Sequence, residues 1–154
     1  MGAALFYHLT RSPLEAALPL LLAKSLQAGW PVVVRGTEAA RMEWLDEVLW
    51  RGGDESFLPH GLAGGRHDAD QPILLTTAQE APNGAACLMA VDGAEVTAED
   101  CAGAERVCIL FDGNDPVALD RARGQWKALT GAGVVAQYWS EESGRWQKKA
   151  ESGG

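Results

Sequence analysis

The side chains best suited to acid–base chemistry in this sequence are three histidines, His8, His60 and His67. An imidazole titrates near neutral pH, so it can transfer a proton or bind a metal ion. The three are too dispersed along the chain to indicate a metal-binding helix. His60 alone lies in a stretch suited to a site, beside large apolar residues. It is therefore the candidate acid or base, and its alternative role is a loop imidazole hydrogen-bonded to backbone.

The glycines and acidic residues do not form a recognisable phosphate or cation site. Neither G-x-x-x-x-G-K-[ST] nor G-x-G-x-x-G after a strand occurs. Residues 61–65 are glycine-rich, but they lack a lysine and precede a polar loop, whereas an anion site needs amides at a helix start. Asp112 begins a run that resembles a calcium loop, but Arg123 stands where the glutamate is required. The sequence thus predicts no cofactor.

The nucleophilic residues are equally uninformative about catalysis. Cys87, Cys101 and Cys108 are an odd number without a C-x-x-C pair, which disfavours a disulfide framework and a zinc site. Ser-His-Asp and Cys-His arrangements cannot be assembled from local motifs. We therefore expect no catalytic residue and no metal, and an interaction module becomes the favoured class.

The first candidate interaction surface follows an amphipathic helix end. Polar turn residues would be expected in this segment, but it contains large side chains instead. These are Trp50, Phe57, Leu58, Pro59 and His60. Such side chains must pack under the loop, against a partner or around a ligand, because exposing them together is unfavourable. Core cover and a partner interface are both compatible with the pattern.

The second candidate surface is on a helix predicted over residues 115–130. Arg123 and Lys127 are four residues apart and share a face, and Trp126 stands three residues from Arg123. Two cations around an aromatic ring would suit an acidic peptide that ends in an aromatic residue with a free carboxylate. The alternative is a solvated helix face with Trp126 turned towards the core.

Strands and helices alternate along the chain and position these residues. Continuous apolar runs at residues 5–9, 31–35, 73–76, 86–91, 106–111 and 134–139 predict strands. Ser12, Pro13 and Glu15 predict a capping box for a deeply packed helix that ends near residue 27, and Thr37 is the expected cap of the next helix. Asp115 is predicted to cap the helix with the basic pair, and residues 97–100 to start a short helix. This order predicts a three-layer α/β fold with a mainly parallel sheet.

Length and charge limit the possible roles of the chain. With 154 residues and 47% hydrophobic composition, we expect one domain over residues 1–150 and a disordered tail over residues 151–154. A net charge of −8 disfavours direct nucleic-acid binding and anionic membranes. The start lacks a basic leader region, and no apolar run approaches 18 residues, so we expect a soluble, cytoplasmic protein.

Several stretches together resemble the chi subunit family of bacterial DNA polymerase III. They are LDEVLW (residues 45–50), ESFLPHGLAG (residues 55–64), FYHL (residues 6–9) and QWKA (residues 125–128). The resemblance covers nearly the whole chain, more weakly between residues 66 and 105. It implies a Rossmann-like fold that lacks nucleotide motifs and an accessory protein without catalysis of its own.

The resemblance also implies partners and assigns them to the two surfaces. Trp50 and Phe57 match residues that meet the psi subunit of the clamp loader, or a helicase that competes for the same place. Arg123, Trp126 and Lys127 match the site for the acidic C-terminal tail of single-stranded-DNA-binding protein. A further basic position of the family falls on Leu119, so the pocket is expected either to be weaker or to be completed by Arg121. The alternative function is a small enzyme or nucleotide-binding protein with a site near His60.

Overall fold

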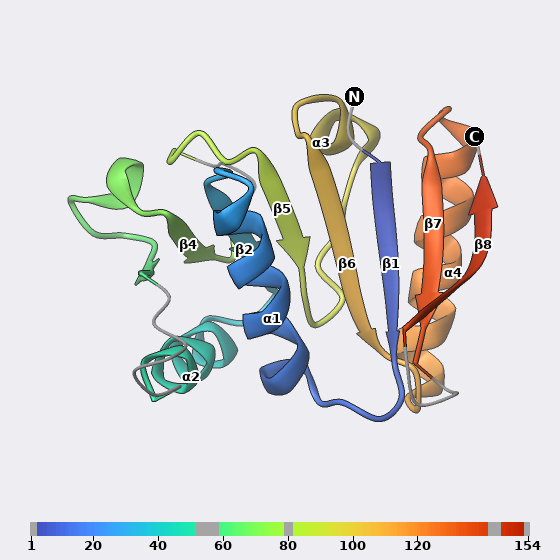
Figure 1. Cartoon of the computed structure of the whole chain (residues 1–154), viewed down its shortest axis with the longest axis horizontal. Coiled ribbons are helices and arrows are strands. Elements are labelled where there is room, and N and C mark those ends of the chain that lie inside the picture. The colour runs from blue at the N-terminus through green and yellow to red at the C-terminus, as the bar shows by residue number, and fades with distance from the viewer. Residues whose placement is uncertain (1–2, 52–58, 79–81, 142–145, 153–154) are drawn as a thin grey trace.

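The computed structural model describes residues 3–51, 59–78, 82–141 and 146–152. In these residues an eight-stranded sheet has the order β3-β4-β2-β5-β6-β1-β7-β8, and every neighbouring pair is parallel except β7 and β8 (Figure 1). The strands are β1 Ala3–Leu9, β2 Val32–Arg35, β3 Gly61–Leu62, β4 Ile73–Thr76, β5 Cys87–Ala90, β6 Arg106–Asp112, β7 Ala136–Ser140 and β8 Gln147–Ser152. The helices are α1 Leu14–Gln27, α2 Ala39–Trp50, α3 Ala98–Ala102 and α4 Pro116–Gly131, with a 3-10 turn at Asp68–Asp70.

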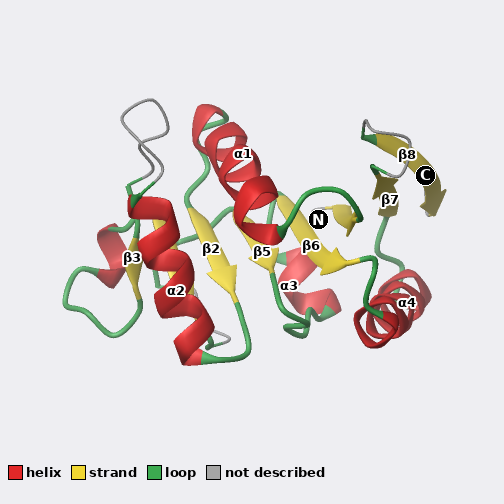
Figure 2. Cartoon of the chain, turned by 90° about the horizontal axis from the view of Figure 1, so that it is seen from below, coloured by secondary structure: helices red, strands yellow, loops and turns green. Residues whose placement is uncertain are grey.

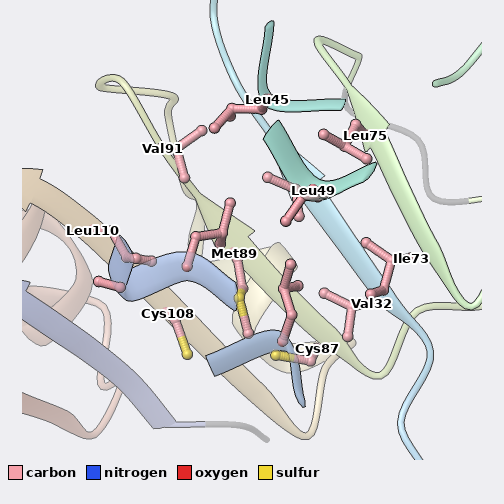
Figure 3. Packing of buried hydrophobic residues seen from close by; sticks show 14 of the residues in the cluster. Val32, Leu45, Leu49, Ile73, Leu75, Cys87, Met89, Val91, Cys108 and Leu110 are labelled. Carbon is pink, nitrogen blue, oxygen red and sulfur yellow. The ribbon is translucent and has the colours of Figure 1, made fainter. Parts of the chain in front are cut away.

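The helices cover both faces of the sheet, which confirms the predicted three-layer α/β architecture. Helices α1 and α2 lie on one face, and α3 and α4 lie on the other (Figure 2). Successive residues of β2 and β5 therefore enter two cores: Val32 and Cys87 pack beneath α1 and α2, whereas Val33 packs on the opposite face. Burial on both faces explains why these strands are continuously apolar. Figure 3 shows the first core.

Two predicted helix caps are wrong, and in both cases a distant partner explains the error. Helix α1 begins at Leu14 without a side-chain cap, because Ser12 Oγ donates to Glu141 Oε2 at 3.0 Å. Helix α2 begins at Ala39, and Thr37 Oγ1 donates instead to the carbonyl oxygen of Asp92 at 3.3 Å. Short hydroxyl side chains take such alternative partners readily.

Two other predicted helix starts are confirmed. Asp115 Oδ1 accepts the N–H of Val117 at 3.0 Å at the start of α4. Thr97 and Asp100 form a reciprocal capping box at the start of α3. In both cases the capping bonds join residues two or three positions apart, so a local sequence pattern is sufficient to predict the helix start.

Helix α1 is less deeply packed than its leucine content predicts. Ala17, Leu18 and Leu22 are buried, whereas Leu20 is 66% exposed. The helix covers one face of the sheet and has no second layer above it, so one arc of its apolar surface meets solvent. None of the described helices is both long and apolar enough to cross a lipid bilayer.

The C-terminal end differs from the predicted disordered tail. Strand β8 runs antiparallel to β7 and includes Glu151 and Ser152, which pair with Gln137 and Ala136. The backbone hydrogen bonds of β7 order these two residues, although their sequence is polar. Gly153 and Gly154 lie outside the described residues.

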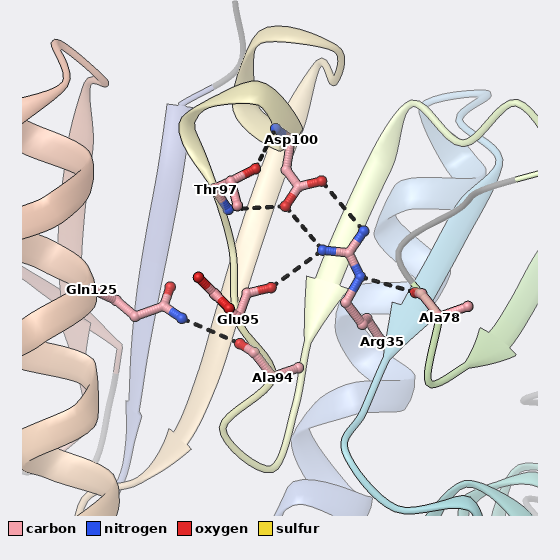
Figure 4. Close-up of polar contacts among 7 residues, drawn as sticks. All are labelled: Arg35, Ala78, Ala94, Glu95, Thr97, Asp100 and Gln125. Carbon is pink, nitrogen blue, oxygen red and sulfur yellow. Dashed lines mark hydrogen bonds and ion pairs between the residues drawn. The ribbon is translucent and has the colours of Figure 1, made fainter.

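A buried ion pair joins the end of β2 to α3 (Figure 4). Arg35 is 4% exposed, and its guanidinium donates to both carboxylate oxygens of Asp100, at 2.9 and 3.3 Å. It also donates to the carbonyl oxygens of Ala78 and Glu95, each at 3.2 Å. Burial raises the pKa of Asp100, but the bonds from Arg35 and Thr97 outweigh it, so this pKa lies below its ordinary value.

Candidate protein-interaction surfaces

Trp50 and His60 form the centre of the first surface. Trp50 is the last residue of α2 and is 54% exposed, so its indole is accessible to a partner. His60 is 5% exposed, and its ring centroid lies 4.3 Å from that of Trp50. His60 Nε2 lies 3.0 Å from the carbonyl oxygen and 3.2 Å from Oδ1 of Asp46. The imidazole thus ties the loop to α2 and supports one side of the indole.

Further apolar groups adjoin this pair. Pro59 is partly exposed and Leu62 is 36% exposed. Leu62 belongs to β3, which is the last described strand at that end of the sheet. We name Trp50, Pro59 and Leu62, with His60 packed against Trp50, the Trp50 surface. Phe57 and Leu58, also predicted for this surface, lie outside the described residues.

The geometry argues against His60 as an acid or base. Its imidazole is buried beneath Trp50 and bonded to Asp46, so a substrate would have to displace the indole to reach Nε2. A general acid or base needs hydrogen-bond access to the reacting atom. His60 therefore acts as a structural support.

Arg123 and Lys127 form the centre of the second surface, on α4. Both side chains are exposed, and neither forms an ion pair with another residue in the described part of the chain. Residues four positions apart on a helix are neighbours, so the two positive charges lie on one ridge. We name Arg123 and Lys127, with the adjoining edge of Trp126, the basic ridge.

Trp126 is only partly available to a ligand. Its ring packs edge-to-face on Phe6 at 5.3 Å and lies 6.2 Å from Tyr138, and its side chain is half-buried. The ring of Trp126 therefore lies mostly towards the core, as in the alternative given for this helix. A peptide on the basic ridge would meet an edge of the indole, not its whole face.

Of the two alternatives for the basic ridge, the structure does not support completion by Arg121. Arg121 packs closely against Gly93, in the turn that follows β5. It precedes Arg123 by two residues, or about 200° around the helix, so the two side chains leave α4 on different sides. Leu119 is half-buried in the second core. The described basic groups of the ridge are therefore Arg123 and Lys127.

The two surfaces lie at opposite ends of the sheet and on opposite faces. Helix α2 packs near β3 and β4, whereas α4 packs near β6 and β7 (Figure 1). Trp50 and the basic ridge are consequently separated by the width of the sheet. Ligands of ordinary peptide size can occupy both places without contact.

A cavity of about 750 Å³ lies at the carboxyl ends of β1, β5 and β6. Strand β1 leads into α1 on one face and β6 leads into α4 on the other, so this is a topological switch point, where α/β proteins bind ligands. Arg41 and Asp92 on its wall form a bidentate ion pair at 3.1 and 3.2 Å. The described residues contain no group of three or more side chains suited to a metal ion. His60 does not line this cavity.

Comparison with known proteins identifies similar sequences. A family model described as "DNA polymerase III chi subunit, HolC" matches residues 1–137. A protein from Rickettsia prowazekii (strain Madrid E), named "Probable DNA polymerase III subunit chi", is 27% identical over 90 residues, which are 58% of this chain and 54% of that protein. The chain thus spans about half the length of this curated relative.

Proposed function

The chain belongs to the DNA polymerase III chi subunit family, a family of non-catalytic accessory replication subunits, and from this premise we propose that it is an adaptor. It holds a psi-type clamp-loader subunit, or a helicase, on the Trp50 surface. It holds the acidic C-terminal tail of single-stranded-DNA-binding protein on the basic ridge. In this role it acts in the bacterial cytoplasm and needs little direct contact with DNA.

The observation that carries the proposal is the separation of the two surfaces. An adaptor must bind two partners at once, and a single shared site would make them compete. Trp50 is near the β3 end of the sheet, and Arg123 and Lys127 are near the β7 end. This arrangement allows simultaneous binding and predicts that a substitution on one surface leaves the other intact.

The Trp50 surface has the composition of an interface centre. A half-exposed tryptophan supported by a buried ring offers a large, rigid apolar contact, and such residues carry much of the energy of protein interfaces. Pull-down with Trp50→Ala should lose the psi-type subunit or helicase. Leu20→Ala is the matched control, because Leu20 is a large apolar side chain that is also more than half exposed but belongs to α1. Loss of the partner in both variants, or in neither, would refute the assignment.

The basic ridge suits an acidic tail for electrostatic reasons. The chain has a net charge of −8, so its overall electrostatic field repels anions. Arg123 and Lys127 are a local exception, because they are adjacent and have no ion-pair partner among the described residues. The carboxylates of the tail meet Arg123 and Lys127, and its terminal phenylalanine packs at the exposed edge of Trp126. Because these contacts are exposed, salt should weaken them.

Calorimetric titration with an acidic peptide that ends in phenylalanine tests this site. Arg123→Ala and Lys127→Ala should each weaken binding about fivefold, the effect of losing roughly 1 kcal/mol from an exposed ion pair. Arg121→Ala is the matched control, because it removes an exposed arginine from another side of the same helix. Equal losses in all three variants would indicate a non-specific charge effect and contradict the proposed ridge.

A further inference from the structure

The turn between β1 and α1 directs three consecutive backbone N–H groups at one carboxylate. Glu141 Oε1 accepts from the N–H groups of Thr10, Arg11 and Ser12, at 3.1, 2.8 and 2.6 Å. Glu141 Oε2 accepts from Ser12 Oγ at 3.0 Å. Four donors from one short turn therefore converge on a single side chain that lies about 130 residues away in the sequence.

Convergent N–H groups at this position of the fold are an oxyanion-binding arrangement. Successive backbone N–H groups form concave sites that bind anions. The turn also follows the first strand, precedes a long helix and lines the cavity at the switch point, where phosphates bind in related architectures. The sequence lacks the glycine-rich motif of a phosphate loop, and yet the donors that such a loop would supply are present.

The occupant of this arrangement is fixed by the sheet. Glu141 directly follows β7, the neighbour of β1, and is 5% exposed. Burial raises the pKa of its carboxyl group, but the N–H bonds from Ser12 and Arg11 outweigh this effect and hold the pKa below its ordinary value. The group thus stays ionised at neutral pH and offers the turn a permanent negative charge.

We propose that the turn of Thr10, Arg11 and Ser12 is an oxyanion site that the chain fills with its own Glu141 carboxylate. Bound there, the carboxylate occupies the donors of this turn in place of a free anion and joins the end of β7 to the start of α1. Removing it leaves a vacant site for a small oxyanion such as formate or inorganic phosphate. This inference does not depend on the proposed partners.

Anion rescue of Glu141→Ala in the full chain tests the proposal. The melting temperature of the variant should rise by about 4 °C in sodium formate relative to sodium chloride at equal ionic strength, as expected near tenfold excess over Kd. The wild type should show no such difference. Glu151→Ala is the matched control, since Glu151 is an exposed carboxylate of β8 that pairs with Lys148 at 3.1 Å.

Two further readouts make the result decisive. If Glu141→Ala is unfolded in chloride, formate or inorganic phosphate should restore its far-ultraviolet circular dichroism. If it is folded, formate should shift the amide NMR signals of Thr10, Arg11 and Ser12. Equal stability in formate and chloride, an unfolded variant that neither anion restores, or an equal gain in the wild type would overturn the proposal.

Discussion

Replacing Arg35 with alanine should destabilise the fold strongly, because the guanidinium is 4% exposed and holds four acceptors. Breaking a buried pair by removing one partner costs about 3–5 kcal/mol. Asp100 is 16% exposed and keeps the N–H of Thr97 at 2.9 Å, so the carboxylate left behind is not wholly unsatisfied. The expected loss is therefore about 3 kcal/mol, at the lower end of that range.

Urea unfolding followed by circular dichroism measures this loss, since the midpoint and slope give the free energy of unfolding. Arg41→Ala is the matched control, because Arg41 has a similar bidentate pair with Asp92 but is 40% exposed. It should lose at most about 1 kcal/mol. If Arg35→Ala lost no more than Arg41→Ala, burial would not be the source of the strength of this pair.

Three other predictions concern the pH dependence of stability and the residues Trp126 and Trp50. Glu141 and Asp100 have lowered pKa values in the folded chain, so both carboxylates stabilise the fold fully above their unfolded pKa values near 4. This stabilisation is lost as the pH falls through the folded pKa values. In urea unfolding between about pH 5 and 2, the free energy of unfolding of Asp100→Asn should therefore depend less on pH than that of the wild type. Trp126→Ala should lose about 2 kcal/mol in the same assay, because the half-buried ring packs on Phe6, and Trp126→Phe should lose less than half of that. Trp50→Ala should change the free energy of unfolding by less than about 1 kcal/mol, since the ring is 54% exposed; a larger loss would make Trp50 a core residue.

The parts of the fold that the sequence predicts correctly depend on local patterns. Residues 32–34, 73–75 and 107–111 are apolar because helices cover both faces of the sheet, and each run lies in a parallel strand. Asp115 caps α4 as expected, because its partner is two residues away. The family resemblance, carried by short motifs in residues 45–64 and 125–128, is confirmed by the match over residues 1–137.

The features that sequence reasoning missed depend on distant contacts. Ser12 has the pattern of a helix cap, but its hydroxyl bonds to Glu141, and nothing within a short window indicates that partner. Arg35 ends an apolar run and gives no sign that Asp100 lies beneath it. Trp126 has the spacing of a ridge residue, but its ring packs inward against Phe6 of β1. Such outcomes follow from strand order, which local periodicity does not encode.

Purification of the tagged chain from its own cells, with mass spectrometry of the co-eluting proteins, tests the adaptor role most directly. The wild type should carry both single-stranded-DNA-binding protein and a clamp-loader subunit or helicase. Trp50→Ala should lose only the latter, and the double variant Arg123→Ala/Lys127→Ala should lose only the former. Loss of both partners in each variant, or retention of both, would contradict two independent surfaces.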